Sequence, residues 1–427
     1  MIPDSLIGTF VHAINRGHMS FSDSTAAVSL PAADRNKQYL LYLHIPFCVV
    51  LCPFCSFHRV QFKKDRAEQY FVALREEIRN ATAAGFRFNE VYIGGGTPTV
   101  LPAELIETVR LIRDLHPVGQ ISVETNPDDI DDVRVPLLRD VGVNRLSVGV
   151  QSFDDQLLRE MHRYDQYGSG QMISERLIRI RGEFDTLNVD MIFNFPHQTK
   201  TSLLNDLRVL TNEVNADQVS FYPLMTANST ARSMQRELGA INYRREKELY
   251  QLIVRHMQNA GYRRSSGWCF SRDGNMIDEY IVERDEYLGL GSGAFSYLDG
   301  SLYASTFSIN HYLHLVEDGT TGIVRQKTMN RVDQMRYYLL MRFFSGSLDL
   351  DAAEYRFDGD FRRALRKELA GLKLIGAIRK SGVQLHLTER GYYLWVVMMR
   401  EFFGGVNDLR EEMRLNISEE RSNLAEH

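Results

Sequence analysis

Short apolar runs and amphipathic stretches alternate along the sequence from Tyr39 to about residue 222, and this alternation constrains the fold more than any other feature. The apolar runs are short and bounded by turn residues, so they predict strands. The expected strands are Tyr39–Ile45, Glu90–Ile93, Gln120–Glu124, Arg145–Val150, Asn188–Phe193 and Gln218–Tyr222. Helical spacing predicts helices between them, at Arg66–Ala83, 102–115, 131–140, 154–162, 171–182 and 201–213.

A repeat of strands and helices gives parallel strands joined by right-handed crossovers. The sequence therefore predicts the α/β fold class, with a partial (β/α)6 TIM-like barrel over residues 37–300. In such barrels the chemistry lies where the strands end at their C-terminal side. We expect the functional residues just beyond the predicted strands.

The regions on either side of this barrel differ in character. Residues 1–36 show no strong period and predict an irregular N-terminal arm. Residues 301–427 predict a small helical or winged-helix accessory domain at the C-terminus. Its expected elements are helices at 331–345, 359–373 and 391–403 and a short strand at Gly382–Thr388. The charged tail after Asn407 is expected to fray.

Charge and cysteine content limit the expected partners and the compartment. The formal net charge is −5 and there is no block of Lys or Arg, so nucleic acid is not an expected partner. Four cysteines in 427 residues do not make a disulfide scaffold, which favours a reducing cytoplasm. The N-terminal segment is unlike a secretion signal, and no stretch approaches the roughly 18 to 20 apolar residues that cross a bilayer. We expect a cytoplasmic, soluble protein with at most peripheral membrane contact.

Three cysteines follow the first predicted strand, at Cys48, Cys52 and Cys55. Three thiolates can hold three irons of a four-iron four-sulfur cluster and leave the fourth iron open to a cofactor. A zinc site is an alternative, with His44 or His58 as the fourth ligand. Three structural cysteines that lie close together by coincidence are the other alternative. The spacing alone favours the cluster and leaves all three open.

Glycines and polar residues follow the later strands. Gly94, Gly95 and Gly96, followed by Thr97, come after the second strand, and glycines let a backbone approach a ligand closely. Polar side chains suited to hydroxyl and carboxylate groups lie at or after the next strands, at Glu124, Gln151, Arg163 and Asp190. A second glycine-rich element contains Gly291. A turn or loop without a ligand is the alternative for each glycine element.

These motifs, together with the run Tyr42–Phe47 before the first cysteine, resemble the radical S-adenosylmethionine enzymes. The branch they resemble is that of the oxygen-independent coproporphyrinogen III oxidases, from about Tyr39 to Ser296. The resemblance implies one 4Fe-4S cluster on Cys48, Cys52 and Cys55, and two S-adenosylmethionine molecules. The cofactor-binding residues that it implies are Tyr42, Phe54, Gly95, Gly96, Thr97, Glu124, Gln151, Arg163, Asp190 and Gly291.

Two departures from this branch bear on the reaction. The oxidases carry a further cysteine at the position of Phe57, and the haem-chaperone relatives carry an HNxxY signature where this chain has Ile277, Asp278 and Ile281. The closest resemblance is then to the class C radical methyltransferases, with the menaquinone ring methyltransferases as the best fit. An oxygen-independent coproporphyrinogen III dehydrogenase and a haem-trafficking relative are the alternatives.

The methyltransferase resemblance implies that a radical from one S-adenosylmethionine activates the methyl group of the other, which then adds to an sp2 ring carbon. The implied substrate is a flat aromatic ring, either quinone or porphyrin-like, and the reductant is a flavodoxin or ferredoxin. Two aromatic stretches, Tyr337–Phe344 and Tyr392–Phe403, suit either ordinary packing or the shielding of a quinone. The sequence identifies no base for the final proton, and its candidates by location alone are Asp278, Glu279, Tyr280 and Glu283.

Overall fold

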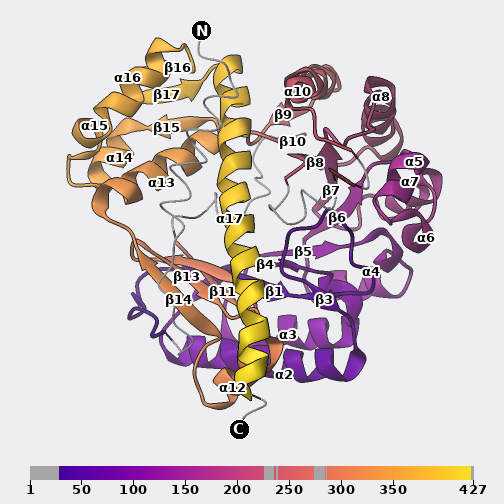
Figure 1. The fold of residues 1–427 in the computed structure, drawn as a ribbon, viewed down its shortest axis with the longest axis vertical. Coiled ribbons are helices and arrows are strands. Elements are labelled where there is room, and N and C mark those ends of the chain that lie inside the picture. Colours follow the sequence, from indigo (N-terminus) through magenta and orange to yellow (C-terminus); the bar gives the residue numbers. More distant parts are fainter. Residues whose placement is uncertain (1–27, 226–234, 237–238, 274–283, 285, 425–427) are drawn as a thin grey trace.

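The computed structural model describes residues 28–225, 235–236, 239–273, 284 and 286–424 (Figure 1). Twelve strands of these residues form one sheet, in the order β14-β13-β12-β11-β1-β4-β5-β6-β7-β8-β10-β9. Within this order, the seven strands from β11 to β8 are all parallel to one another. Their bounds are β11 Tyr287–Leu290, β1 Tyr39–Ile45, β4 Phe88–Gly95, β5 Gln120–Thr125, β6 Arg145–Gln151, β7 Thr186–Phe193 and β8 Gln218–Pro223. The predicted partial barrel and its strands are confirmed.

Helices follow the parallel strands and lie along the outside of the curved sheet (Figure 1). Their bounds are α2 Lys64–Ala83, α3 Pro102–Leu115, α4 Arg134–Asp140, α5 Asp155–Glu160, α6 Tyr164–Tyr167, α7 Gly170–Arg179, α8 Lys200–Arg208 and α10 Tyr243–Asn259. A π-helical turn at Val209–Val214 continues α8, and single 3-10 turns lie at Pro98–Val100 and Pro127–Asp129. α2, which confirms the first predicted helix, buries an apolar face that contains Ala67, Tyr70, Phe71, Leu74 and Ile78.

β1 lies between two parallel neighbours, and all seven of its residues are buried. A strand covered on both sides of the sheet is expected to be apolar throughout, since neither face meets water. This explains why the first strand is a continuous apolar run rather than an alternating one.

Antiparallel strands extend the sheet at both ends. β12 Phe295–Leu298, β13 Ser301–Ser305 and β14 Ile323–Thr328 follow β11, while β10 Cys269–Ser271 and β9 Arg263–Arg264 follow β8. The helix α12 Ile309–Glu317 connects β13 to β14. The sheet therefore continues through residue 300, the proposed limit of the barrel region, which lies between β12 and β13.

The C-terminal region contains helices and a small antiparallel sheet. The helices are α13 Arg331–Phe344, α14 Leu350–Arg356, α15 Phe361–Ala364, α16 Arg366–Leu374 and α17 Glu389–Leu424. The strands pair in the order β15 Ser347–Asp349, β17 Gln384–Leu387 and β16 Ile378–Ser381. The predicted helical character with a short strand near residue 385 is confirmed.

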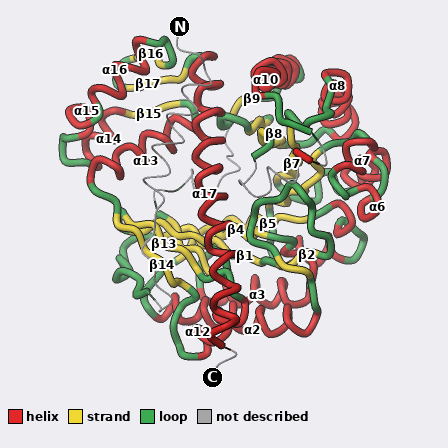
Figure 2. The backbone as a smooth tube through the Cα atoms, viewed as in Figure 1, coloured by secondary structure: helices red, strands yellow, loops and turns green. Residues whose placement is uncertain are grey.

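The expectation that the tail after Asn407 frays is wrong. α17 is a single helix that passes from beside β16 and β17 to the level of α12 (Figure 2). Beyond Asn407, its Leu409 and Met413 are buried against Phe307 and Ala304, which keeps the charged segment helical. Among the described residues, no helix is both long and apolar enough to cross a membrane.

Candidate active site

The three cysteines lie on one loop between two very short parallel strands. Cys48 ends β2, Phe47–Cys48, which pairs with β3, Val60–Gln61. Within the loop, one guanidinium nitrogen of Arg59 donates to the carbonyls of Cys52 and Cys55, at 2.6 and 3.0 Å. All three cysteines are free thiols and line the same cavity. The loop is thus held by its backbone while the sulfurs are left for a ligand.

The surroundings of the thiols fit a metal cluster. Burial raises the pKa of the Cys48 thiol to about 12, so a thiolate there needs a positive partner such as iron. The Cys48 sulfur lies 3.7 Å from Thr97 Oγ1, and the Cys52 sulfur lies 3.5 Å from Arg163 Nη1. A side chain at Gly96 would place a Cβ 3.0 Å from the Cys48 sulfur and 2.7 Å from the Phe47 carbonyl oxygen. Only glycine at position 96 lets the chain after β4 approach the cysteine loop this closely.

The histidines proposed as zinc ligands serve other purposes. His44 uses both ring nitrogens, at 2.8 Å from the Tyr42 hydroxyl and 2.9 Å from the His58 carbonyl. His58 places Nε2 3.1 Å from Ser292 Oγ, and its ring stacks on that of His44. No three His, Cys, Asp or Glu side chains in the described part of the chain form a group that could hold a single metal ion. A four-iron cluster does not require the three thiolates to meet at one metal ion, because each thiolate binds a separate iron.

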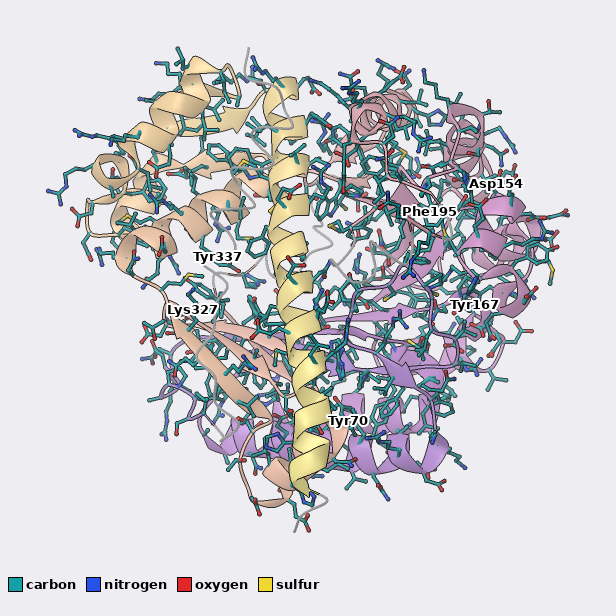
Figure 3. All side chains as sticks on the ribbon, viewed as in Figure 1. Tyr70, Asp154, Tyr167, Phe195, Lys327 and Tyr337 are labelled. Carbon is teal, nitrogen blue, oxygen red and sulfur yellow. The ribbon has the colours of Figure 1, made fainter. Side chains whose placement is uncertain are left out.

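A cavity of about 270 Å³ lies at the C-terminal ends of the parallel strands. The predicted site residues that line it are Tyr42, Cys48, Cys52, Phe54, Cys55, Gly95, Gly96, Glu124, Gln151, Arg163 and Asp190. They come from β1, the cysteine loop, the C-terminal parts of β4 to β7 and, for Arg163, the connection between α5 and α6, so the fold brings together residues far apart in the sequence. Tyr167 and Tyr337 also line this cavity, and Figure 3 shows them on opposite sides of α17.

Glu124 is held by the glycine element beside it. Its carboxylate accepts from the Tyr92 hydroxyl at 2.9 Å and from the Gly95 amide at 3.1 Å. A Cβ at Gly94 would lie 2.7 Å from the Glu124 carboxylate. The glycines at the end of β4 therefore make room for Glu124 as well as for a ligand.

Arg163 is a buried cation in the cavity wall, 4% exposed. Its guanidinium donates to the Gly149 carbonyl and, at 3.1 Å, to Asn126 Oδ1, while Nε is buried without a hydrogen-bond partner in the structure. A buried guanidinium in the wall of this cavity suits a ligand carboxylate. This geometry fits the carboxylate of an amino-acid cofactor.

Asp190 has the polar partners that its place in an apolar strand requires. Ser147 Oγ and Asn188 Nδ2 each donate to its carboxylate at 2.8 Å. Gln151, at the end of the preceding strand, has a φ of 76°, a left-handed conformation that non-glycine residues seldom adopt. Both residues line the cavity.

Two predicted site residues do not line the cavity. Thr97 lies behind the cysteine loop, where its hydroxyl accepts from Asn126 Nδ2 at 2.7 Å. The Gly291 amide donates to the buried carboxylate of Glu77 at 2.8 Å, and a Cβ at Gly291 would lie 2.5 Å from the Tyr70 hydroxyl. Gly291 therefore permits close packing behind β1. The candidate bases Asp278, Glu279, Tyr280 and Glu283 lie outside the described residues.

The two aromatic stretches Tyr337–Phe344 and Tyr392–Phe403 supply part of the α17 side of the cavity, whereas the lining residues beyond Phe403 were not expected there. This side is lined by Tyr337 of α13 and by Phe402, Phe403, Val406, Asn407, Leu409 and Arg410 of α17. Phe343, Phe344 and Trp395, in the same two aromatic stretches, are fully buried in ordinary packing. The sequence feature that could have indicated a buried helix there is the helical spacing of apolar residues past Asn407, as at Leu409 and Met413.

Residues 42–210 match the radical SAM superfamily. The chain is 28% identical over 366 residues to the heme chaperone HemW of Lactococcus lactis, across 83% of this chain and 94% of that protein. It is 26% identical over 376 residues to the oxygen-independent coproporphyrinogen III oxidase of Salmonella typhimurium, across 82% and 80% of the two chains.

Among solved structures, coproporphyrinogen III oxidase HemN from Escherichia coli superposes with a TM-score of 0.72. The overlap covers 86% of this chain and 90% of HemN at 24% sequence identity, which establishes a common fold. The cysteine loop and the cavity residues from Tyr42 to Ile192 lie within residues 42–210, which match the superfamily. Residues 42–210 therefore match the radical SAM superfamily, which implies a 4Fe-4S cluster and S-adenosylmethionine, in a chain that is similar to the coproporphyrinogen III oxidases and the HemW chaperones.

Proposed function

We propose that this protein is a radical SAM enzyme that acts on a carboxylate-bearing tetrapyrrole, by the oxidative chemistry that the coproporphyrinogen III oxidases are named for. The observation that carries the proposal is one cavity lined by three thiols, an aromatic wall and the arginine Arg410. The two relatives named above, a heme chaperone and a coproporphyrinogen oxidase, support a porphyrin-like ligand.

The thiol side of the cavity is the proposed place for the cofactors. Cys48, Cys52 and Cys55 would hold the cluster, which when bound supplies the electron that splits S-adenosylmethionine into a 5′-deoxyadenosyl radical. Arg163 offers a buried guanidinium to a ligand carboxylate, and Glu124 offers a carboxylate to an amine or hydroxyl. The remaining predicted residues that line the cavity would orient this molecule and, in the two-cofactor arrangement of the family, a second one.

The α17 side of the cavity is the proposed place for the substrate. Tyr337, Phe402 and Phe403 offer ring surfaces to a flat macrocycle. Arg410 lines the same side and is 7% exposed, so it can pair with a carboxylate away from bulk water. A prenylated quinone has no carboxylate for this arginine, which is why the tetrapyrrole is preferred.

Methylation of an sp2 ring carbon, with menaquinone as the substrate, is the second candidate. It is supported by Phe57 at the position of the oxidases' further cysteine, and by Ile277, Asp278 and Ile281 in place of the chaperone signature. Neither relative named above is a methyltransferase by name, so these sequence differences alone support this reaction.

Anaerobic incubation of the reconstituted protein with S-adenosylmethionine and dithionite tests the proposal. Dithionite replaces the proposed flavodoxin or ferredoxin, and coproporphyrinogen III, haem and menaquinone are supplied in separate reactions. Mass spectrometry is expected to show 5′-deoxyadenosine and a decarboxylated porphyrinogen, without S-adenosylhomocysteine. Methylated menaquinone with one S-adenosylhomocysteine per 5′-deoxyadenosine would establish the second candidate instead. Stoichiometric haem binding without turnover of any substrate would identify a haem-trafficking protein.

The substrate side has a test of its own. Arg410→Gln is expected to weaken binding of coproporphyrinogen III by roughly 12- to 160-fold, because a hydrogen bond to a charged group is worth about 1.5 to 3 kcal/mol. Arg390→Gln, which makes the same change at an exposed position of α17, is the matched control. Equal affinities of the two variants would remove Arg410 from the substrate site.

A further inference from the structure

The C-terminal helix reaches the cysteine loop directly. Arg414 of α17 donates from one guanidinium nitrogen to the carbonyl oxygens of Ser56 and Phe57, at 2.6 and 2.7 Å. These two residues follow Cys55 immediately, and the Arg414–Ser56 bond joins positions 358 residues apart. The last part of α17 therefore contacts the backbone that carries the third thiol.

Several contacts fix this part of α17 in place. Leu409 and Met413 are buried against Phe307, whose ring in turn lies 4.3 Å from that of His58. The Arg410 guanidinium lies 4.6 Å from the centre of the Phe57 ring. Arg414 thus belongs to an anchored helix segment and does not reach the loop from a freely moving end.

Arg59, which is itself a residue of the cysteine loop, also binds the backbone of this loop. Its hydrogen bonds to the carbonyls of Cys52 and Cys55 complement those of Arg414 to the next two carbonyls. Four carbonyl oxygens around the third cysteine are therefore capped by two guanidinium groups. Burial and the nearby Arg410 lower the pKa of Arg414, while the Cys55 thiol raises it, which places its charge within electrostatic reach of that thiol.

We propose that Arg414 is a positioning residue for the cysteine loop and that its charge raises the reduction potential of the cluster. The hydrogen bonds fix the backbone after Cys55, and so fix the direction of its sulfur. A cluster gains negative charge on reduction, and a nearby cation stabilises that state. The inference depends on the cluster alone and not on the substrate proposed above, so either can fail without the other.

The full-length protein, reconstituted anaerobically, provides the test. Arg414→Gln is compared with Arg414→Lys, which keeps the charge, and with the matched control Arg390→Gln at an exposed position of the same helix. The measurements are iron per chain, the midpoint potential by redox titration with electron paramagnetic resonance, the rate of cluster bleaching in air, and the melting temperature.

Arg414→Gln is expected to melt like the control but to show a more negative midpoint potential, faster bleaching or a loss of iron. Arg414→Lys is expected to keep the potential near that of the unmodified protein and still bleach faster, because one amine replaces the guanidinium on two carbonyls. The proposal is overturned if Arg414→Gln matches the control in iron content, potential and bleaching. If Arg414→Gln does not fold, the Lys variant decides, and bleaching no faster than the control overturns the positioning role.

Discussion

The hydroxyl of Tyr42 donates its proton to Nδ1 of His44. This direction follows from the other ring nitrogen, because Nε2 of His44 lies 2.9 Å from the His58 carbonyl, which can only accept. Burial lowers the pKa of His44 to about 4, so the ring is neutral and only one nitrogen carries a proton. The Tyr42 oxygen can therefore only accept a hydrogen bond from a cavity ligand, which suits an ammonium or hydroxyl donor.

Replacing Tyr42 with Phe is expected to weaken S-adenosylmethionine binding by roughly 2- to 12-fold, the equivalent of one hydrogen bond of about 0.5 to 1.5 kcal/mol. Calorimetric titration of the reconstituted protein measures the affinity. Tyr39→Phe removes a hydroxyl at the opposite end of the same strand, outside the cavity, and is the control. An unchanged affinity in Tyr42→Phe would show that the hydroxyl serves His44 alone.

Gly96→Ala is expected to reduce iron and sulfide per chain after reconstitution. The new methyl group would meet the Phe47 carbonyl and the Cys48 sulfur at 2.7 and 3.0 Å, so the thiol must move from its place. Gly119→Ala is the control, since a Cβ there has no neighbour within 4 Å. Chemical analysis of iron and sulfide checks this, and equal loading of the two variants would contradict it.

Glu77→Ala is expected to lower the melting temperature strongly, by a loss of about 3 kcal/mol or more. The buried carboxylate accepts from the Gly291 amide, the Gly322 amide and the Tyr312 hydroxyl, and its removal leaves three buried donors unpaired. Glu76→Ala, at the exposed neighbouring position, is the control. Thermal melting followed by circular dichroism is the measurement, and similar melting of the two variants would refute the assignment.

Asp206→Asn is expected to reduce the pH dependence of stability between about pH 4 and pH 7. Burial raises the pKa of Asp206 from 3.8 to about 7, so the folded state binds more protons than the unfolded state in this range. Its contribution to stability is therefore present at low pH and falls as the pH rises, by at most about 4 kcal/mol.

Melting temperatures at pH 5 and pH 8 measure this effect. The unmodified protein and the exposed control Asp185→Asn are expected to lose more stability over this interval than Asp206→Asn. The side-chain amide oxygen of the Asp206→Asn variant can still accept from the Phe153 amide, which lies 2.7 Å from the present carboxylate, so the variant is expected to fold. Parallel pH profiles for all three proteins would rule out Asp206 as the titrating group.

The sequence was most informative where structure depends on neighbours along the chain. The first strand was predicted over its full length, because burial on both faces leaves a continuous apolar run. Glu124 and Asp190 were predicted to converge because parallel strands end at one edge, and both line the cavity. No local pattern shows that Leu288 of β11 pairs with Leu41 of β1, since these residues meet only in the folded sheet.

The same limit explains why the part of the cavity wall beyond Phe403 was not predicted. Arg410 and Arg414 lie in a charged segment that is typical of an exposed tail. Their partners, Phe57 and the carbonyls beside it, lie in the first sixth of the chain. Only the four-residue spacing of Leu409 and Met413 indicated a buried face there, and it did not identify the surface that covers it.

The contact between Arg414 and Ser56 also has a consequence for biosynthesis. A chain is made from its N-terminus, so the cysteine loop emerges long before the helix segment that caps its carbonyls. Throughout most of synthesis the loop lacks this partner and the cavity lacks its α17 wall. Until the end of α17 has docked, Arg59 holds the backbone of this loop without Arg414.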